Sequence, residues 1–206
     1  MLSIEQTAGF LLAASVVTLA PGPDNMMVLS IGMAKGRIHG IAFGLGCACG
    51  CLIHTLLATF GVSAVIAGSP HAFWLLRMCG GAYLVWLGVG AWRGSVRKSV
   101  GAPGDEQAVM SLFWKGVLAN VMNPKVILFF LSFLPQFVLA GESGVALQVA
   151  LLGVLFVVQA ALIFGLIGYF SGTVGQWMAL NRRAGVVLNR LAALVFVTLG
   201  VRLLWG

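Results

Sequence analysis

The sequence predicts an all-α polytopic membrane protein with six transmembrane helices, arranged as two inverted repeats of three helices each. The first observation is composition: 60% of the 206 residues are hydrophobic, 8% are charged and the mean hydropathy is +1.04, which is too apolar for a water-soluble domain of this length. The second is that the apolar residues form runs of roughly 20 residues or more, the length that a helix needs to cross a bilayer. The third is that Lys and Arg gather in alternate connections between these runs.

The apolar runs define six spans within a single transmembrane domain that covers residues 1–206. We expect these spans at about residues 6–33, 38–67, 72–92, 112–139, 145–171 and 185–205. The longest polar stretch, RGSVRKSVGAPGDEQ, divides the chain into a first repeat at 1–92, a cytoplasmic linker at 93–111 and a second repeat at 112–206. Because each half has three spans, the second half enters the membrane from the opposite side, so the repeats are inverted.

The basic residues predict the orientation of the chain. Of the 12 Lys and Arg residues, nine lie in the connections after spans one, three and five, or at the adjoining span ends: Lys35, Arg37, Arg93, Arg97, Lys98, Lys115, Arg182, Arg183 and Arg190. Since short cytoplasmic loops collect Lys and Arg, these connections are expected in the cytoplasm and both termini outside it. The formal net charge of +7 is therefore interpreted as a topology signal for a protein in a lipid bilayer, and not as a sign of nucleic-acid binding.

Spans one and four each contain a helix-breaking motif, PGPDN at Pro21–Asn25 and NPK at Asn123–Lys125. Because proline has no amide hydrogen, carbonyl groups one turn earlier lose their helical donors. Each span is drawn with about 28 residues, or about 42 Å of helix against about 30 Å of hydrocarbon, so we expect the breaks near the middle of the membrane. Irregular backbone at that depth is tolerated only where it is buried in protein or lines a cavity.

The two breaks predict a substrate site between them. Broken helices in the two halves of an inverted repeat indicate where a transporter binds its substrate, and a restarted helix offers free amides to a carboxylate. The candidate substrate-binding residues are Pro21, Gly22, Pro23, Asp24, Asn25, Asn120, Asn123, Pro124 and Lys125.

The charged and amide side chains among these candidates each have two interpretations. Asp24 binds a substrate ammonium or the coupling proton, or it only caps the amides of the restarted helix. Lys125 pairs with Asp24 or with a substrate carboxylate, or it extends to water near the cytoplasmic face. The asparagines bind an amino-acid ligand, or they only link helices. One acid beside one base leaves no surplus negative charge for a cation, which favours a neutral substrate.

Span two carries Cys47, Cys51 and His54 on one helical face. They define the alternative function, a soft heavy-metal exporter or binder. Against this hypothesis, three ligands on one helix rarely surround a metal, and glycines at 40, 44, 46 and 50 are typical of a close-packing helix in which cysteine serves as a small residue. We therefore assign no metal ligands, and we assign His54 to proton coupling together with Asp24.

The two break motifs, the six-span hydropathy and the GAYLVWLG run at Gly81–Gly88 resemble the LysE/RhtB family of amino-acid exporters. The resemblance covers essentially the whole chain. It implies export of small amino acids or their derivatives across the bacterial inner membrane, driven by the proton or another ion gradient; the termini, expected outside the cytoplasm from the basic residues, are then periplasmic. It also implies a homodimer and no cofactor. We expect no enzyme, because HExxH, GxSxG and paired intramembrane carboxylates do not occur in the sequence.

Overall fold

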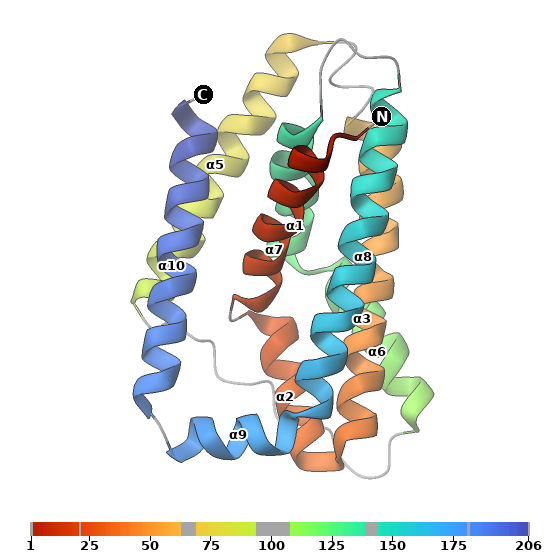
Figure 1. Ribbon diagram of the computed structural model, residues 1–206, viewed down its shortest axis with the longest axis vertical. Coiled ribbons are helices and arrows are strands. Elements are labelled where there is room, and N and C mark those ends of the chain that lie inside the picture. The colour runs from red at the N-terminus through yellow and green to blue at the C-terminus, as the bar shows by residue number, and fades with distance from the viewer. Residues whose placement is uncertain are drawn as a thin grey trace.

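The computed structural model describes residues 2–20, 22–62, 69–93, 108–138, 144–180 and 182–205, and these ranges contain helices and no strands. The α-helices are α1 (Ile4–Leu19), α2 (Pro23–Lys35), α3 (Arg37–Leu57), α5 (Pro70–Trp92), α6 (Val109–Val121), α7 (Pro124–Leu128), α8 (Val145–Tyr169), α9 (Ser171–Leu180) and α10 (Arg182–Trp205). Shorter turns are π-helical at η1 (Ala58–Val62) and η2 (Phe129–Phe133) and 3-10 at η3 (Leu134–Phe137). Most of the helices run along the long axis of the molecule (Figure 1). The predicted all-α class is confirmed for the described residues.

Several of these helices have the length and composition of membrane spans. Among the described residues, Arg37–Gly61 and Val145–Tyr169 each meet both criteria alone. Two further candidates are bent pairs, α1 with α2 at 56° and α6 with Pro124–Phe137 at 51°. The structure is therefore consistent with a polytopic membrane protein, and the bent pairs are the two spans in which the sequence predicts a break.

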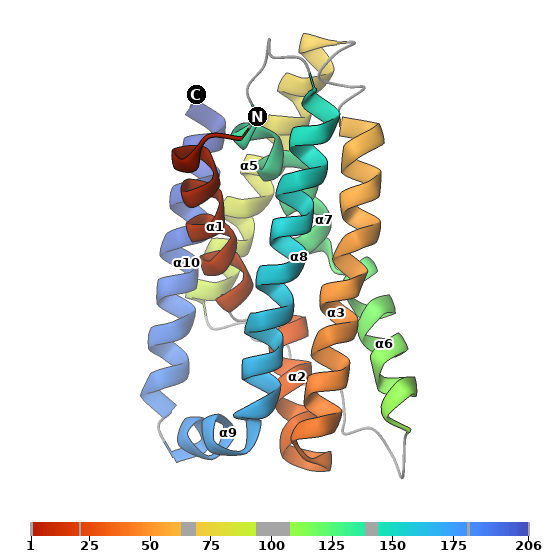
Figure 2. The ribbon, with the colours of Figure 1, turned by 45° about the vertical axis from the view of Figure 1, so that its right-hand side comes forward.

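The helices α5 and α10 form an antiparallel pair beside the remaining helices (Figures 1 and 2). They are 23 and 24 residues long and correspond to the predicted third and sixth spans. Their packing is close, because a Cβ added at Gly88 would lie 2.7 Å from a side-chain carbon of Val197. The arrangement as two inverted repeats of three spans remains a prediction.

A short helix that the sequence analysis did not predict is α9, in a stretch assigned mainly to the connection before span six. It lies across the lower end of the molecule in Figures 1 and 2. Small residues bring it against α2: Ser171 packs on Gly32, and Gly175 packs on Met33. Apolar periodicity did not predict α9, because its contact with α2 depends on glycine and serine, which allow a close approach, and not on a hydrophobic stripe.

The helix α3 packs through glycines on both sides. A Cβ added at Gly50 would lie 2.9 Å from Asn120 Cβ on α6, and one added at Gly44 would lie 2.9 Å from Phe164 Cβ on α8. Helices in lipid associate through such close approaches, because lipid chains compete for ordinary hydrophobic contacts. The predicted close packing of this span is confirmed.

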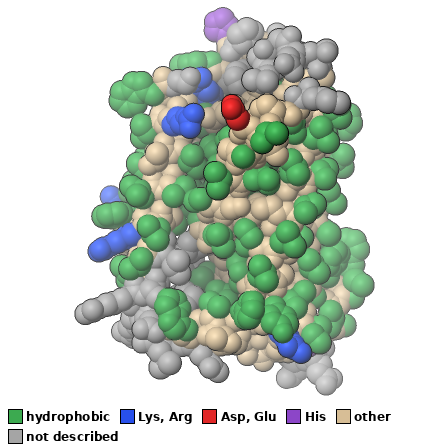
Figure 3. Space-filling view, viewed as in Figure 1, with side chains coloured by type: hydrophobic (Ala, Val, Ile, Leu, Met, Phe, Trp, Pro, Cys, Tyr) green, Lys and Arg blue, Asp and Glu red, His purple; other side chains and the backbone are tan. Residues whose placement is uncertain are grey.

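The outer surface is apolar, as a bilayer requires. Hydrophobic side chains are spread over the whole described surface that is visible in Figure 3, and charged side chains are few. Large residues such as Leu56, Trp86 and Leu162 are more than half exposed. Since exposed side chains of this kind on several helices would face water unfavourably, their environment is expected to be lipid.

Candidate functional site

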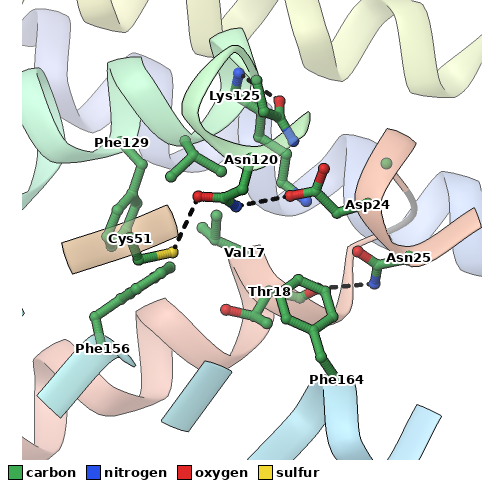
Figure 4. Close-up of a pocket in the computed structure, with 13 residues that line it drawn as sticks. Val17, Thr18, Asp24, Asn25, Cys51, Asn120, Lys125, Phe129, Phe156 and Phe164 are labelled. Atoms are coloured by element: carbon green, nitrogen blue, oxygen red, sulfur yellow. Dashed lines mark hydrogen bonds between the residues drawn. The ribbon is translucent and has the colours of Figure 1, made fainter. Parts of the chain in front are cut away.

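The two helix breaks lie against each other. The chain leaves α1 after Leu19 and restarts at Pro23, and it leaves α6 after Val121 and restarts at Pro124. Two hydrogen bonds join the breaks across more than 90 residues of sequence: Asn120 to Asp24, drawn in Figure 4, and Lys125 to the Ala20 carbonyl. The structure thus brings together the PGPDN and NPK motifs, as the sequence predicts, while their depth in a membrane remains a prediction.

The carbonyl groups that the breaks release are bound by side chains. The Asn25 amide donates to the Thr18 carbonyl at 2.8 Å and to the Leu19 carbonyl at 3.4 Å. The Lys125 ammonium donates to the Ala20 carbonyl at 2.9 Å. On the other side, the Asn120 carbonyl already accepts a backbone bond of 2.9 Å from the Asn123 amide, and His54 Nε2 lies a further 3.2 Å from it. The side chains of Asn25 and Lys125 thus compensate for the missing helical donors at the first break, since an unpaired buried carbonyl costs about 1–3 kcal/mol.

Asp24 is buried and directed across the site. It occupies the first turn of α2, where the positive end of the helix dipole favours a carboxylate. The N-cap of α2 is Gly22 and makes no side-chain capping bond. Instead, Asp24 Oδ2 accepts a hydrogen bond of 2.8 Å from Asn120 Nδ2. The cap interpretation of Asp24 is therefore wrong, because the helix restarts at Pro23 and carries the carboxylate past the capping position.

Lys125 is also buried, with 8% of its surface exposed. Besides its bond to the Ala20 carbonyl, its ammonium lies 5.6 Å from the centre of the Phe196 ring on α10. The interpretation in which Lys125 extends to water is therefore wrong for this conformation. Its ammonium forms no ion pair with Asp24 in the part of the chain that the structure describes, so each charged group is bound by a neutral partner.

A small cavity lies at the junction of the breaks. One part of its lining is polar and comes from the predicted site, in the residues Gly22, Asp24, Asn25, Asn120, Asn123 and Lys125. Phe129, Phe156 and Phe164 contribute aromatic surface. The volume is about 20 Å³, or room for roughly one water molecule. This conformation is thus too closed for an amino acid, and binding one would require the helices around the cavity to separate.

Other residues of the two motifs begin or cap the restarted helices. Pro23 and Pro124 each begin a helix. Pro21 lies outside the described residues. Asn123 lines the cavity and also caps α7, because its Oδ1 accepts from the Lys125 amide at 3.0 Å. A structural role is thus established for Asn123.

The residues of span two separate into different environments. Cys51 reaches the cavity, with its Sγ 3.4 Å from Asn120 Oδ1. His54 lies behind Asn120, with its ring 5.6 Å from that of Phe130, and lines a second, largely apolar cavity of about 160 Å³. The described residues contain no group of three His, Cys, Asp or Glu side chains that could hold a metal ion. Cys47, Cys51 and His54 therefore do not form the metal site of the alternative hypothesis.

Several residues of the site were not predicted from the sequence. Thr18 lines the cavity and its hydroxyl donates to Gln159 on α8 at 3.4 Å. Thr18 is polar and lies directly before a predicted break, and Gln159 is a polar residue within an otherwise apolar span. These two features of the sequence could have identified Thr18 and Gln159 as candidate site residues. The three phenylalanines carried no such signal, because an aromatic residue in a membrane helix can equally face lipid.

Apolar helices of spanning length, two bent pairs and a buried polar cluster at their junction define a polytopic membrane protein with an internal site, the class that includes transporters. The chain belongs to the LysE type translocator family, whose model matches residues 15–206. The family resemblance that the motifs suggested is thus confirmed.

Relatives with curated descriptions span nearly the whole chain. An uncharacterized membrane protein of Pseudomonas aeruginosa, PA4757, is 31% identical over 94% of this chain and 92% of its own length. A leucine efflux protein of Enterobacter sp. is 30% identical over 94% of this chain and 92% of its own. A homoserine/homoserine lactone efflux protein of Salmonella typhi is 28% identical over 94% of this chain and 97% of its own. No solved structure matches the chain.

Proposed function

We propose that this protein is a secondary transporter that exports small, neutral amino acids or their derivatives across the bacterial inner membrane. Two of its relatives are named as efflux proteins for leucine and for homoserine or its lactone, which supports an amino-acid cargo. The observation that carries the proposal is that a buried carboxylate, Asp24, and a buried ammonium, Lys125, line one cavity between two broken helices. A zwitterion has one group to complement each of them.

Substrate binding would exchange bonds that the closed site makes with itself. The substrate ammonium would take the place of the Asn120 amide on Asp24, and the substrate carboxylate would take the place of the Ala20 carbonyl on Lys125. Because these internal bonds hold the two breaks together, replacing them would loosen the contact between the two halves. This gives a physical basis for alternating access around the PGPDN and NPK breaks, in which binding energy is spent on rearranging the helices.

The proposed coupling ion is the proton, carried in antiport by Asp24 with His54. Asn120 supports this assignment, because its side chain binds Asp24 and its carbonyl lies at His54 Nε2. A proton on the carboxylate would remove the charge that binds the substrate ammonium, so proton and substrate would compete for one group. The homodimer that the family resemblance implies forms part of the same proposal.

Export from cells tests the function. Cells that produce the protein, loaded with dipeptides containing each neutral amino acid, are expected to release at least one of these amino acids faster than control cells. The variant Lys125→Met is expected to reduce this export at least tenfold, because it removes a charge-assisted bond to the substrate. The matched control is Lys115→Met, at an exposed lysine of α6, which is expected to export like the wild type.

Two results would contradict the proposal. One is that no amino acid leaves the wild-type cells faster than the control cells. The other is wild-type export by Lys125→Met when both variants reach the membrane in equal amounts.

A further inference from the structure

An amide group beside the cavity has no partner for one of its ends. Gln159 lies on α8, and its Oε1 accepts a hydrogen bond of 3.4 Å from the Thr18 hydroxyl. Its Nε2 is buried and makes no hydrogen bond to any residue that the structure describes. Buried amide nitrogens are almost always paired in native proteins, so an unpaired one requires an explanation.

One end of the Gln159 amide lacks a partner whichever way the amide is oriented. If the amide were turned over, its nitrogen would donate to the Thr18 hydroxyl, since a hydroxyl can both donate and accept. The oxygen would then be the end without a partner. In either orientation, a hydroxyl group from another molecule could complete the pairing.

The position of Gln159 connects this free end with the substrate cavity. Thr18 is 4% exposed and lines the cavity. Phe156, one turn before Gln159 on α8, also lines it. In Figure 4, Thr18, Phe156 and Phe164 lie on one side of the cavity, and Asp24, Asn120 and Lys125 lie toward the other. A zwitterion whose charged groups bind Asp24 and Lys125 would therefore extend its side chain toward Thr18 and Gln159.

We propose that Gln159 is a specificity-determining residue that, together with Thr18, binds an oxygen atom in the substrate side chain. The cargo class is then the neutral amino acids with a hydroxyl or similar oxygen function, in preference to those with aliphatic side chains. The inference rests on the proposed export function. An aliphatic side chain would leave the Gln159 amide unpaired in the bound state, and this penalty is the source of the discrimination.

The test compares two substitutions of glutamine on the same helix. The first is Gln159→Leu, which removes the amide. The control is Gln148→Leu, because Gln148 is buried on α8, accepts a bond of 3.2 Å from Gln6 and does not line the cavity. Export of homoserine and of leucine is measured in competition from the same cells, and the readout is the ratio of the two rates.

We expect the ratio of homoserine to leucine export to fall about five- to tenfold in Gln159→Leu, as for the loss of one hydrogen bond. The ratio should not change in Gln148→Leu, even if its total export falls. If Gln159→Leu does not reach the membrane, Gln159→Met, which is closer in shape to glutamine, is measured with the same expectation.

A ratio within twofold of the wild type in the Gln159 variants would overturn the inference and leave the proposed function intact. An equal fall in Gln148→Leu would also overturn it, because the effect would then not be specific to the cavity. A wild-type protein that exports leucine but not homoserine would do the same. If the wild type exported no amino acid, the proposed function itself would fail, so the two failures are distinguishable.

Discussion

Asn120 connects three helices through its own atoms. Its Nδ2 donates to Asp24 on α2, its Oδ1 accepts from Cys51 on α3 and its carbonyl lies at His54 on α3. The residue itself is fully buried on α6. Because the Asn120 amide already binds Asp24, another group that binds this carboxylate must compete with Asn120. The arrangement of the two breaks is therefore sensitive to whatever binds Asp24.

The substitution Asp24→Asn isolates the charge at this residue. The new amide retains an oxygen that can accept from Asn120, so we expect the thermal unfolding temperature to remain within a few degrees of the wild type. Gradient-driven export should fall at least tenfold, because the carboxylate no longer binds the substrate ammonium or a proton. The measurement is export from proteoliposomes with an imposed proton gradient. Gradient-driven export at the wild-type rate would contradict the role proposed for Asp24.

At the scale of elements, the broken helices and the glycine-rich helix α3 differ in how easily they can rearrange. The breaks expose polar backbone that side chains or a ligand must bind, so they are the parts of the fold that the proposed substrate would rearrange. By contrast, α3 is packed so closely against α6 and α8 that a Cβ at several of its glycines would overlap a neighbour. Movements during transport are therefore expected at the breaks and not within the contact of α3 with α6.

A pair of glycine substitutions tests this packing. At Gly116 on α6, an added Cβ would overlap the Phe43 carbonyl and lie 3.0 Å from the Cys47 amide nitrogen. We expect Gly116→Ala to destabilise the protein by about 1–3 kcal/mol, the usual effect of overpacking. The matched control is Gly165→Ala on α8, where no heavy atom lies within 4 Å of the added Cβ.

The control should be as stable as the wild type or more stable by up to about 1 kcal/mol, because alanine has the higher helix propensity. Thermal unfolding in detergent measures both variants. Equal unfolding temperatures for the two variants would show that the close contact between α3 and α6 contributes little to stability.

At the scale of the whole molecule, several helices begin or end at one of the two opposite ends of the long axis. The two termini lie at the same end in Figure 1, and α5 and α8 also begin there. The junction of α2 and α3, where Lys35 ends one helix and Arg37 begins the next, lies at the opposite end. This distribution agrees with the predicted alternation of basic and non-basic connections, while the orientation in the membrane remains a prediction.

Reporter fusions test that orientation. Alkaline phosphatase joined after Trp205 is expected to be active, because the C-terminus should be periplasmic. The same enzyme joined after Arg93 should be inactive, while a fluorescent protein that folds only in the cytoplasm should fluoresce there. The reverse pattern at both positions would contradict the predicted topology and would place the basic connections outside the cell.

Much of the fold and part of the site could be predicted from the sequence. Composition and apolar run length determine that the chain is helical and membrane-embedded, because lipid offers no hydrogen bonds to backbone groups. The prolines determine where two helices break, since proline has no amide hydrogen wherever it occurs. The motifs around these prolines also identified the family. Each of these inferences depends on a property of the local chain.

Only the tertiary structure decided which groups bind each other. Lys125 binds the Ala20 carbonyl and not Asp24, Asp24 binds Asn120, and Thr18 binds Gln159. These partners are separated by 96 to 141 residues, and the choice between them depends on differences of a few ångströms in how separate helices pack. The sequence of one helix shows which of its positions are polar. The distance between two helices, by contrast, depends on the small residues and side-chain volumes of every element between them.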